Sequence, residues 1–213
     1  MLTATYTLVA LSVEQASIRM GLLSLQKYVQ ANLMQRQSIT LGQLEYAFDT
    51  LNHLYQACRW CKSEVYLIPA IRMATERADR LLDELGSLNA SAAEMLHTLR
   101  LRLGSVGTHT EECVEKICSS IDACCNTLLA RLEKEESEMF AMARSVICGE
   151  SWFSIANQFL RHDEKEVETR RSKVSISELP LAPPLLALSA RFHPEVGVDP
   201  NWPLPLSAPV NGC

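Results

Sequence analysis

The sequence has little of what a β-sheet requires. Glycine occurs only 8 times in 213 residues, and aromatic residues make up 6% of the chain. No stretch alternates β-branched and aromatic residues between hairpin turns, which is the pattern of a half-buried strand. This scarcity argues against a sheet-based fold and predicts an all-α protein.

Basic residues, long apolar runs and catalytic motifs are also scarce. The formal net charge is −5, whereas nucleic-acid binding requires a clustered excess of Lys and Arg. No run of eighteen apolar residues occurs, so neither a transmembrane helix nor a membrane partner is expected. The apolar N-terminus lacks the basic segment of a secretory signal, which predicts a mature cytoplasmic protein. Without a Gly-rich phosphate loop or a nucleophile elbow, we expect no enzymatic activity.

The cysteines allow two interpretations. In helical patterns, free cysteine ordinarily behaves as a small buried hydrophobe, reduced in a reducing compartment. Alternatively, Cys58 and Cys61 form a C-x-x-C motif that could act as a redox pair or, with cysteines from a later helix, hold zinc. That motif normally needs a second pair or a βαβ context, and neither is present. The cysteines are Cys58, Cys61, Cys113, Cys118, Cys124, Cys125, Cys148 and Cys213.

Helical periodicity runs through most of the chain. Apolar residues recur at three- and four-residue steps, which is the spacing of one helix face. The pattern predicts helices over about 7–33, 40–69, 71–103 and 110–148, followed by a short helix over 152–160.

Local signals place the ends of these helices. Thr40 and Gln43 have the spacing of a capping box. Pro69 is expected to end the second helix, because proline disfavours the α conformation at the residue before it. Residues 104–108 are expected to form a turn, and Gly149 to stop the fourth helix.

The composition changes near residue 165. Residues 178–213 hold all but one of the nine prolines and show no periodic apolar face. Proline in the interior of a helix kinks or breaks it. We therefore expect a helical domain over 1–165 and a proline-rich, flexible tail over 166–213.

Two similar phrases stand in the predicted second and fourth helices. Residues 59–69 read RWCKSEVYLIP, and residues 131–143 read RLEKEESEMFAMA. Each has a glutamate five residues after its arginine, then an apolar pair. The phrases resemble the H-x-x-x-E-E signature of hemerythrin-like domains, a likeness that covers about residues 7–162. The resemblance implies an antiparallel up-down four-helix bundle with a two-metal (di-iron) centre inside it.

The residues that would bind metal are mostly replaced. The resemblance puts the family's histidines at Gln15, Arg59, Asn89 and Arg131, and its two helix carboxylates at Ser63 and Glu135. Arginine is always protonated and has no lone pair to offer a metal. The five histidines fall at none of these positions; they are His53, His97, His109, His162 and His193.

These substitutions lead to two hypotheses of function. The first is a degenerate hemerythrin-like domain with no metal or other cofactor, acting as a non-enzymatic interaction or regulatory protein through self-association or an unknown protein partner. The alternative is a sensor or carrier that binds iron or zinc through a shifted ligand set. That set would draw on Glu64, Glu135, Glu136, His53 and the Cys58–Cys61 pair.

The arginines themselves allow two arrangements. Arg131 and Glu135 are four residues apart, the spacing of an ion pair on one helix face. Arg59 could join them inside the bundle, with Gln15 and Asn89 as hydrogen-bonding neighbours. In the other arrangement both arginines extend to solvent, and the residues after them, Trp60 and Leu132, pack inside.

Overall fold

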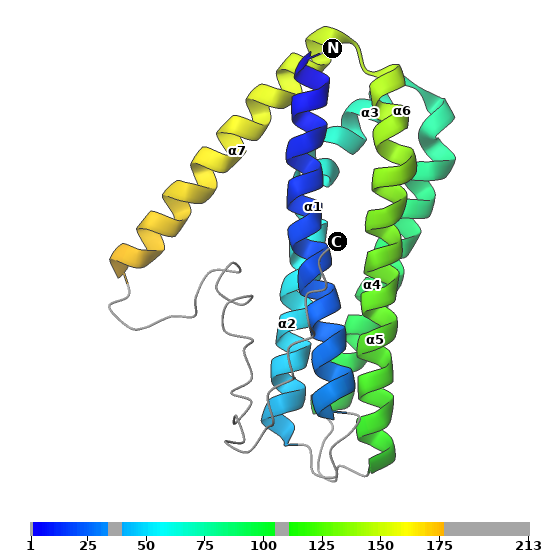
Figure 1. The fold of residues 1–213 in the computed structure, drawn as a ribbon, viewed down its shortest axis with the longest axis vertical. Coiled ribbons are helices and arrows are strands. Elements are labelled where there is room, and N and C mark those ends of the chain that lie inside the picture. The colour runs from blue at the N-terminus through cyan, green and yellow to red at the C-terminus, as the bar shows by residue number, and fades with distance from the viewer. Residues whose placement is uncertain (1, 34–39, 105–110, 177–213) are drawn as a thin grey trace, which may run out of the picture. The chain divides into compact units, whose positions relative to one another are not determined.

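The structure is a computed structural model that describes residues 2–33, 40–104 and 111–176 (Figure 1). These residues are almost entirely helical and include no strand, which confirms the all-α prediction. In chain order the helical elements are α1 (Leu2–Tyr28), η1 (Val29–Leu33), α2 (Leu41–Arg59), η2 (Ser63–Leu67), α3 (Ile68–Ala74), η3 (Glu76–Ala78), α4 (Asp79–Gly104), α5 (Glu111–Lys134), η4 (Glu135–Met139), α6 (Phe140–Val146) and α7 (Gly149–Ile176).

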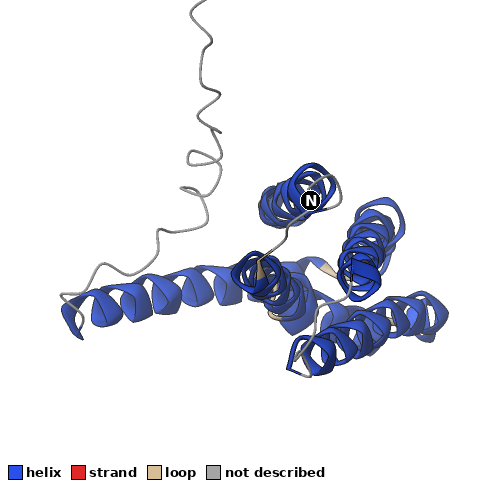
Figure 2. Cartoon of the chain, turned by 90° about the horizontal axis from the view of Figure 1, so that it is seen from below, coloured by secondary structure: helices blue, strands red, loops and turns tan. Residues whose placement is uncertain are grey.

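The long helices α1, α2, α4 and α5 pack side by side. α1 contacts α2 and α5, and α4 contacts both α2 and α5 (Figures 1 and 2). The chain divides into two units, Met1–Glu164 and Lys165–Cys213. Of the second unit, the structure describes only residues 165–176, the C-terminal part of α7.

The start of α2 follows the sequence prediction. Thr40 accepts a hydrogen bond from the backbone N–H of Gln43, and the Gln43 side chain accepts one from the backbone N–H of Thr40. This capping box satisfies donors that the first turn of a helix otherwise leaves without partners.

Several predicted helix ends are wrong. α1 begins at Leu2 instead of residue 7. Pro69 does not end a helix; it lies in the first turn of α3, where its missing N–H has no helical partner to lose. The break comes instead at Thr75, whose extended backbone separates α3 from α4 within the predicted helix 71–103.

The end of the chain's helical part also differs from the prediction. The fourth long helix stops at Val146 because Ile147 is extended, and Gly149 opens α7 instead of closing the preceding helix. α7 continues to Ile176, so residues 166–176 are helical where a flexible tail was predicted. The predicted turn at 104–108 and the remaining tail lie outside the described residues, except that Gly104 ends α4.

One helical segment meets the length and composition of a membrane span. It covers Leu2–Ala31, with a mean hydropathy of 1.3 and one third of its most apolar stretch buried inside the protein. Core helices of water-soluble proteins share these properties, so composition alone does not place this helix in a bilayer. The finding nevertheless differs from the expectation that no segment would qualify.

The core consists of two apolar clusters. One gathers the middle and end of α1 with α2, the second half of α4 and most of α5, and includes Leu22, Leu51 and Leu99. The other gathers the start of α1 with α3, the start of α4, α6 and the start of α7, and includes Leu11 and Leu85. A layer of buried polar side chains lies between them along the helices, and it is the most unusual feature of the interior.

Candidate functional site

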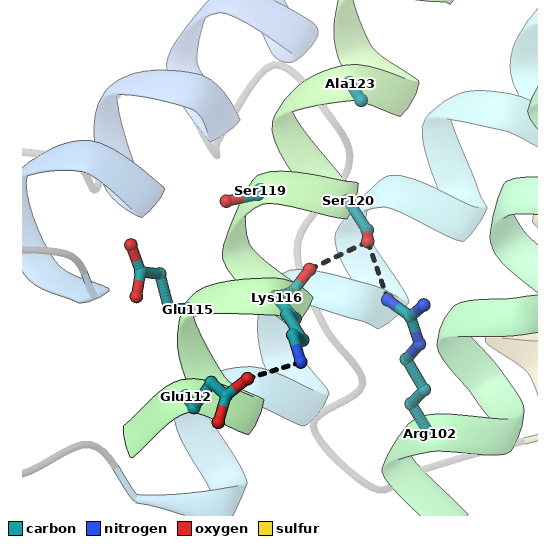
Figure 3. A pocket seen from close by; sticks show the side chains of 7 residues that line it. All are labelled: Arg102, Glu112, Glu115, Lys116, Ser119, Ser120 and Ala123. Atoms are coloured by element: carbon teal, nitrogen blue, oxygen red, sulfur yellow. Dashed lines mark hydrogen bonds and ion pairs between the residues drawn. The ribbon is translucent and has the colours of Figure 1, made fainter. Parts of the chain in front are cut away.

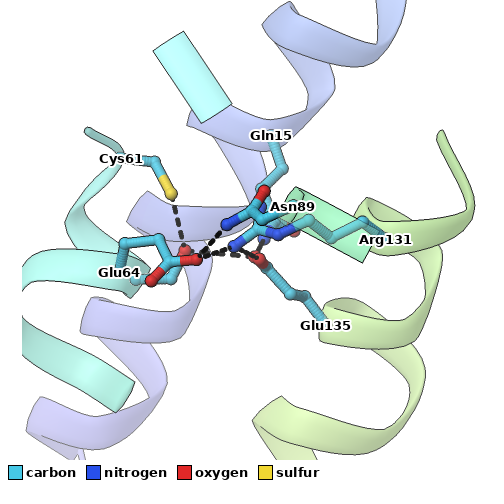
Figure 4. Close-up of polar contacts among 7 residues, drawn as sticks. Gln15, Cys61, Glu64, Asn89, Arg131 and Glu135 are labelled. Carbon is cyan, nitrogen blue, oxygen red and sulfur yellow. Dashed lines mark hydrogen bonds and ion pairs between the residues drawn. The ribbon is translucent and has the colours of Figure 1, made fainter. Parts of the chain in front are cut away.

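The polar layer is built from side chains on four stretches of the chain: α1, the residues after α2, α4, and the continuous helix formed by α5 and η4. Gln15 lies on α1 between Leu11 and Ile18, which belong to different apolar clusters. Figure 4 shows converging side chains of Gln15 from α1, Cys61 and Glu64 from the segment after α2, Asn89 from α4, Arg131 from α5 and Glu135 from η4. Ser63 at the start of η2 belongs to the same layer, because its hydroxyl donates to Glu135. Of these, Gln15, Cys61, Ser63, Arg131 and Glu135 are buried.

Two π-helical turns, η2 and η4, position site residues in the two similar phrases. The backbone N–H of Ile68 bonds to the C=O of Ser63, and that of Phe140 bonds to the C=O of Glu135. These i→i+5 bonds are characteristic of π-helix, which is rare and occurs frequently at functional sites. Each π turn begins at a site residue, Ser63 in η2 and Glu135 in η4.

The two phrases of the sequence therefore share a local structure. Each π turn leads into a short α-helix, α3 or α6, that ends at an extended residue, Thr75 or Ile147. They differ before the turn. α5 runs into its π turn without interruption, whereas α2 ends at Arg59 and leaves Trp60 and Cys61 outside regular helix.

Arg131 forms ion pairs with two carboxylates. Its Nη2 lies 2.6 Å from Oε1 of Glu135 and 2.5 Å from Oε1 of Glu64. The side chains of Arg131 and Glu135 have no solvent exposure, and that of Glu64 is 24% exposed. The predicted Arg131–Glu135 pair is thus confirmed, and the alternative that Arg131 extends to solvent is wrong. A buried guanidinium needs such partners, since an unpaired buried charge is very costly.

Amide and hydroxyl groups complete the carboxylate environments. Asn89 Nδ2 donates to the Glu64 oxygen that also faces Arg131, at 2.7 Å. Oε2 of Glu135 accepts from the Gln15 amide and, at 3.1 Å, from the Ser63 hydroxyl. The predicted roles of Gln15 and Asn89 as hydrogen-bonding neighbours are therefore confirmed. Ser63 in turn lies 3.1 Å from Sγ of Cys61.

The electrostatics of the layer keep Arg131 charged. Burial disfavours its charged form, but the attraction of Glu135 and Glu64 outweighs burial and raises the pKa of Arg131. Burial raises the pKa of Glu135, although Arg131 and the hydrogen bonds of Ser63 and Gln15 favour its carboxylate. Arg131 is therefore a permanent cation at the centre of the site.

Some polar atoms of the layer lack a partner among the described residues. They are Nε and Nη1 of Arg131 and the side-chain carbonyl oxygens of Gln15 and Asn89. Oε1 of Glu135 meets Arg131 as an ion pair only, without the alignment of a hydrogen bond. Buried polar atoms ordinarily have hydrogen-bond partners, so this layer has capacity for further polar contacts.

Arg59 does not join the site. It is exposed and lies over the Trp60 ring, with its Cζ 5.7 Å from the ring centroid. Trp60 is also exposed, at 63%, so the prediction that it packs inside is wrong, whereas Leu132 is buried as expected. The physical reason is the end of α2 at Arg59, which turns both side chains outward before the π turn begins. Glu136 is also outside the layer, paired with Arg19 at 3.0 Å.

The cysteines that the structure describes are all free thiols. Cys58 and Cys61 are buried beside the polar layer. Cys118, Cys124 and Cys125 are buried in the adjacent apolar cluster. Burial raises the pKa of Cys58 and of Cys124 to about 12, so these thiols stay protonated at neutral pH. Protonated thiols are poor nucleophiles and poor metal ligands.

No group of three His, Cys, Asp or Glu side chains suited to a metal ion occurs within residues 2–33, 40–104 and 111–176. Of the residues in the shifted ligand set, Glu64 and Glu135 lie in the same site, but each forms an ion pair with Arg131, which stands between them. His53 is exposed on α2. The Glu64–Arg131 pair was not predicted, and no local spacing signals it, because the two residues are 67 apart in sequence.

A shallow cavity on the surface is a weaker candidate. It has a volume of about 550 Å³ and is lined by both charges, with Lys116 paired to Glu112 at 2.6 Å (Figure 3). Arg102 donates to the Ser120 hydroxyl at 3.0 Å within it. Lys116 and Glu112 neutralise each other there, and no polar side chain of the cavity is buried, so the polar layer remains the site with the more specific chemistry.

Comparison with known proteins does not assign this site to a family. No family model, no curated protein and no solved structure matches the chain.

Proposed function

We propose that this chain is a degenerate hemerythrin-like domain, an antiparallel four-helix bundle that acts as a non-enzymatic interaction or regulatory protein. The observation that carries the proposal is the position of Arg131. A guanidinium lies where side chains from four parts of the bundle converge, 2.5–2.6 Å from two carboxylates. In a metal-binding bundle of this kind, a cation would be expected at that place.

The donor set does not suit a di-iron centre. Such a centre needs several neutral imidazoles together with carboxylates. Here the layer offers amides, a hydroxyl and two carboxylates, and both carboxylates already balance Arg131. An arriving divalent ion would also meet the repulsion of the guanidinium at low effective dielectric. We therefore propose that Arg131 takes the structural role of the metal and that no redox or oxygen chemistry remains.

A buried ion pair is better suited to specifying an arrangement than to adding stability. Replacing such a pair with apolar residues is often neutral, whereas removing one partner is strongly destabilising. The layer joins α1, η2, α4 and α5 by directed contacts between two non-directional apolar clusters. We propose that it fixes the register of these helices and so keeps the outer surfaces of the bundle in place for a partner.

One observation favours the alternative, a metal-linked sensor or carrier. Acceptor oxygens of Gln15, Asn89 and Glu135 remain without an aligned hydrogen bond beside a second carboxylate, Glu64. If the Arg131 side chain left the interior, these oxygens would form a set suited to a hard cation. Our leading proposal requires that this does not happen.

Metal analysis separates the two proposals. Untagged protein is produced in medium supplemented with iron and zinc, and its metal content is measured by elemental analysis beside that of Glu135→Gln. We expect no stoichiometric metal in either protein. Two irons per chain that are lost in Glu135→Gln would overturn the leading proposal. Zinc that is retained in Glu135→Gln and released by thiol-reactive reagents would also overturn it and direct attention to the cysteines.

A further inference from the structure

The outer face of α1 is unusually apolar. Six large hydrophobic side chains on it are exposed, with exposed fractions from 44% to 90%. They follow one another at alternating four- and three-residue steps when the exposed Ala16 is included. We call this set the α1 stripe: Leu2, Tyr6, Val9, Val13, Ala16, Met20 and Leu23. Alternating three- and four-residue steps are the spacing of a coiled-coil seam.

The stripe is not a displaced core face. The opposite side of α1 is buried in the two apolar clusters through residues such as Leu8, Leu11 and Leu22. Monomeric proteins rarely expose a contiguous apolar surface of this length, and such surfaces usually mark interaction sites. α1 thus has two apolar faces, of which the described fold covers one.

The stripe carries no charge of its own. Between Leu2 and Gln26 the only charged residues are Glu14 and Arg19, and both are partly buried beside the stripe. Arg19 is paired with Glu136 at 3.0 Å. A neutral face is electrostatically compatible with a copy of itself, whereas a face of one sign would repel its copy.

We propose that the α1 stripe binds the α1 stripe of a second copy of this chain in an antiparallel two-fold dimer. A two-fold interface must be self-complementary. Suppose that Val13 of one copy faces Val13 of the other at the two-fold axis. Met20 lies seven residues after Val13 and Tyr6 lies seven residues before it, so Met20 of each copy faces Tyr6 of the other. Leu2 then meets Leu23 at each end, so every large apolar side chain of the stripe gains an apolar neighbour.

Two features favour the antiparallel direction. A parallel pair would place Lys27, the next residue at the seam spacing, beside its own copy. Antiparallel packing separates these two lysines and also places opposite ends of the two helix dipoles together. The stripe spans 22 residues from Leu2 to Leu23, roughly 30 Å of helix. An interface one helix wide and of that length belongs to the smaller size class, so we expect a dissociation constant in the micromolar range.

A bilayer surface is a less suitable occupant. Helices that lie in the membrane interface are rich in Lys and Arg on their polar face. α1 instead turns its other face into the protein core, and the whole chain carries a net charge of −5. A second copy of the chain would bury the apolar side chains of the α1 stripe without requiring basic residues.

This inference rests on the proposed interaction role and names its partner. Sedimentation velocity of the full chain over about 1–200 μM tests it, a range that brackets the expected micromolar dissociation constant. We expect a concentration-dependent monomer–dimer equilibrium. Val13→Glu should weaken association at least tenfold, because the two new carboxylates meet at the axis. Leu101→Glu is the matched control, since Leu101 on α4 is 61% exposed and Val13 is 67% exposed. The control should associate as the wild type does.

Several results would overturn the inference. A wild type that is monomeric throughout, or equal association of Val13→Glu and wild type, would do so. Flotation of wild type with phosphatidylcholine–phosphatidylserine vesicles, lost in Val13→Glu and without any dimer in solution, would assign the stripe to membranes instead. Helical circular dichroism confirms that each variant is folded. If Val13→Glu does not fold, Val13→Ser replaces it, with weakened association again expected.

A crosslinking experiment tests the register, in a background with Cys148 and Cys213 replaced by serine. Val13→Cys should form a disulfide between copies on mild oxidation, and Tyr6→Cys alone should not. Mixing Tyr6→Cys with Met20→Cys should restore the crosslink, whereas a Tyr6→Cys homodimer would indicate a parallel pair and overturn the antiparallel dimer. Metal content and assembly are independent readouts: a metal-free monomer contradicts only the dimer, and an iron-bound dimer contradicts only the proposed function.

Discussion

Arg131 and Arg59 hold the same place in two similar phrases, yet their environments are opposite. Arg131 is fully buried between Glu64 and Glu135, whereas Arg59 is exposed over Trp60. The difference arises because α5 continues as helix beyond Arg131, while α2 ends at Arg59. The same residue type therefore has a large energetic role in one phrase and a small one in the other.

We predict that Arg131→Ala lowers the free energy of unfolding by about 3–5 kcal/mol. The loss comes from leaving Glu135 and part of Glu64 without their buried counter-charge. Urea denaturation followed by circular dichroism at neutral pH measures it. Arg59→Ala is the matched control and should change stability by less than about 0.5 kcal/mol, as exposed substitutions usually do. A loss below about 0.5 kcal/mol for Arg131→Ala would show that the buried pair is not maintained in solution.

At the scale of the element, the contact between α1 and α2 depends on the absence of a side chain. A Cβ atom added at Gly21 would lie 2.6 Å from Cδ2 of Leu54. Leu54 is itself buried in the apolar cluster, so its side chain has little room to move. Gly21 lies in the interior of α1, where glycine is unfavourable, and the close approach of α2 explains its presence.

We predict that Gly21→Ala and Gly86→Ala change the free energy of unfolding by different amounts, although both replace a glycine within a helix. Gly86 on α4 has no atom within 4 Å of an added Cβ, so Gly86→Ala should stabilise by about 0.5–1 kcal/mol through helix propensity alone. Gly21→Ala should be less stable than Gly86→Ala by about 1–3 kcal/mol, because overpacking of the core opposes the same gain. Thermal and urea denaturation of both variants measures the difference. Equal stabilisation would mean that Leu54 moves aside freely.

At the scale of the whole molecule, the interior combines apolar clusters with several protonated thiols. Burial raises the pKa of Cys58 and Cys124 to about 12 and raises that of Cys61, Cys118 and Cys125 as well. The unfolded chain would lose these protons near pH 9. The folded chain therefore holds more protons than the unfolded chain between pH 9 and 12, and its stability must fall as the pH rises through that window.

We predict that the free energy of unfolding of the reduced protein declines from pH 9 upward. Each strongly shifted thiol contributes on the order of 1 kcal/mol per pH unit to this decline. Denaturation at pH 8, 9, 10 and 11 in the presence of a phosphine reductant measures the slope. Cys124→Ala is the comparison, because it removes one buried thiol. Its free energy of unfolding should fall less steeply with pH than that of the wild type, by the contribution of one thiol. This difference in slope is expected whatever the stability of the variant at pH 8. Parallel slopes for the variant and the wild type would contradict the prediction.

Part of the site could be predicted from the sequence because it depends on local spacing. The capping box of Thr40 and Gln43 and the Arg131–Glu135 pair each join residues three or four apart on one helix. Such contacts depend on helix geometry, which periodicity reveals. Glu64 and Arg131 are 67 residues apart in sequence, and no local pattern determines which helix faces another.

The sequence by itself determined that this protein is helical, where α2 begins, and that its two arginine-containing phrases are related. These properties follow from propensity, periodicity and short-range hydrogen bonds. Only the tertiary structure decided that Arg131 is buried, that Arg59 is exposed, and that the other described helices leave one face of α1 exposed. Burial depends on where a helix breaks and on which neighbours approach it. The π turns and extended residues that set those positions are stabilised by packing between helices that lie far apart in the sequence.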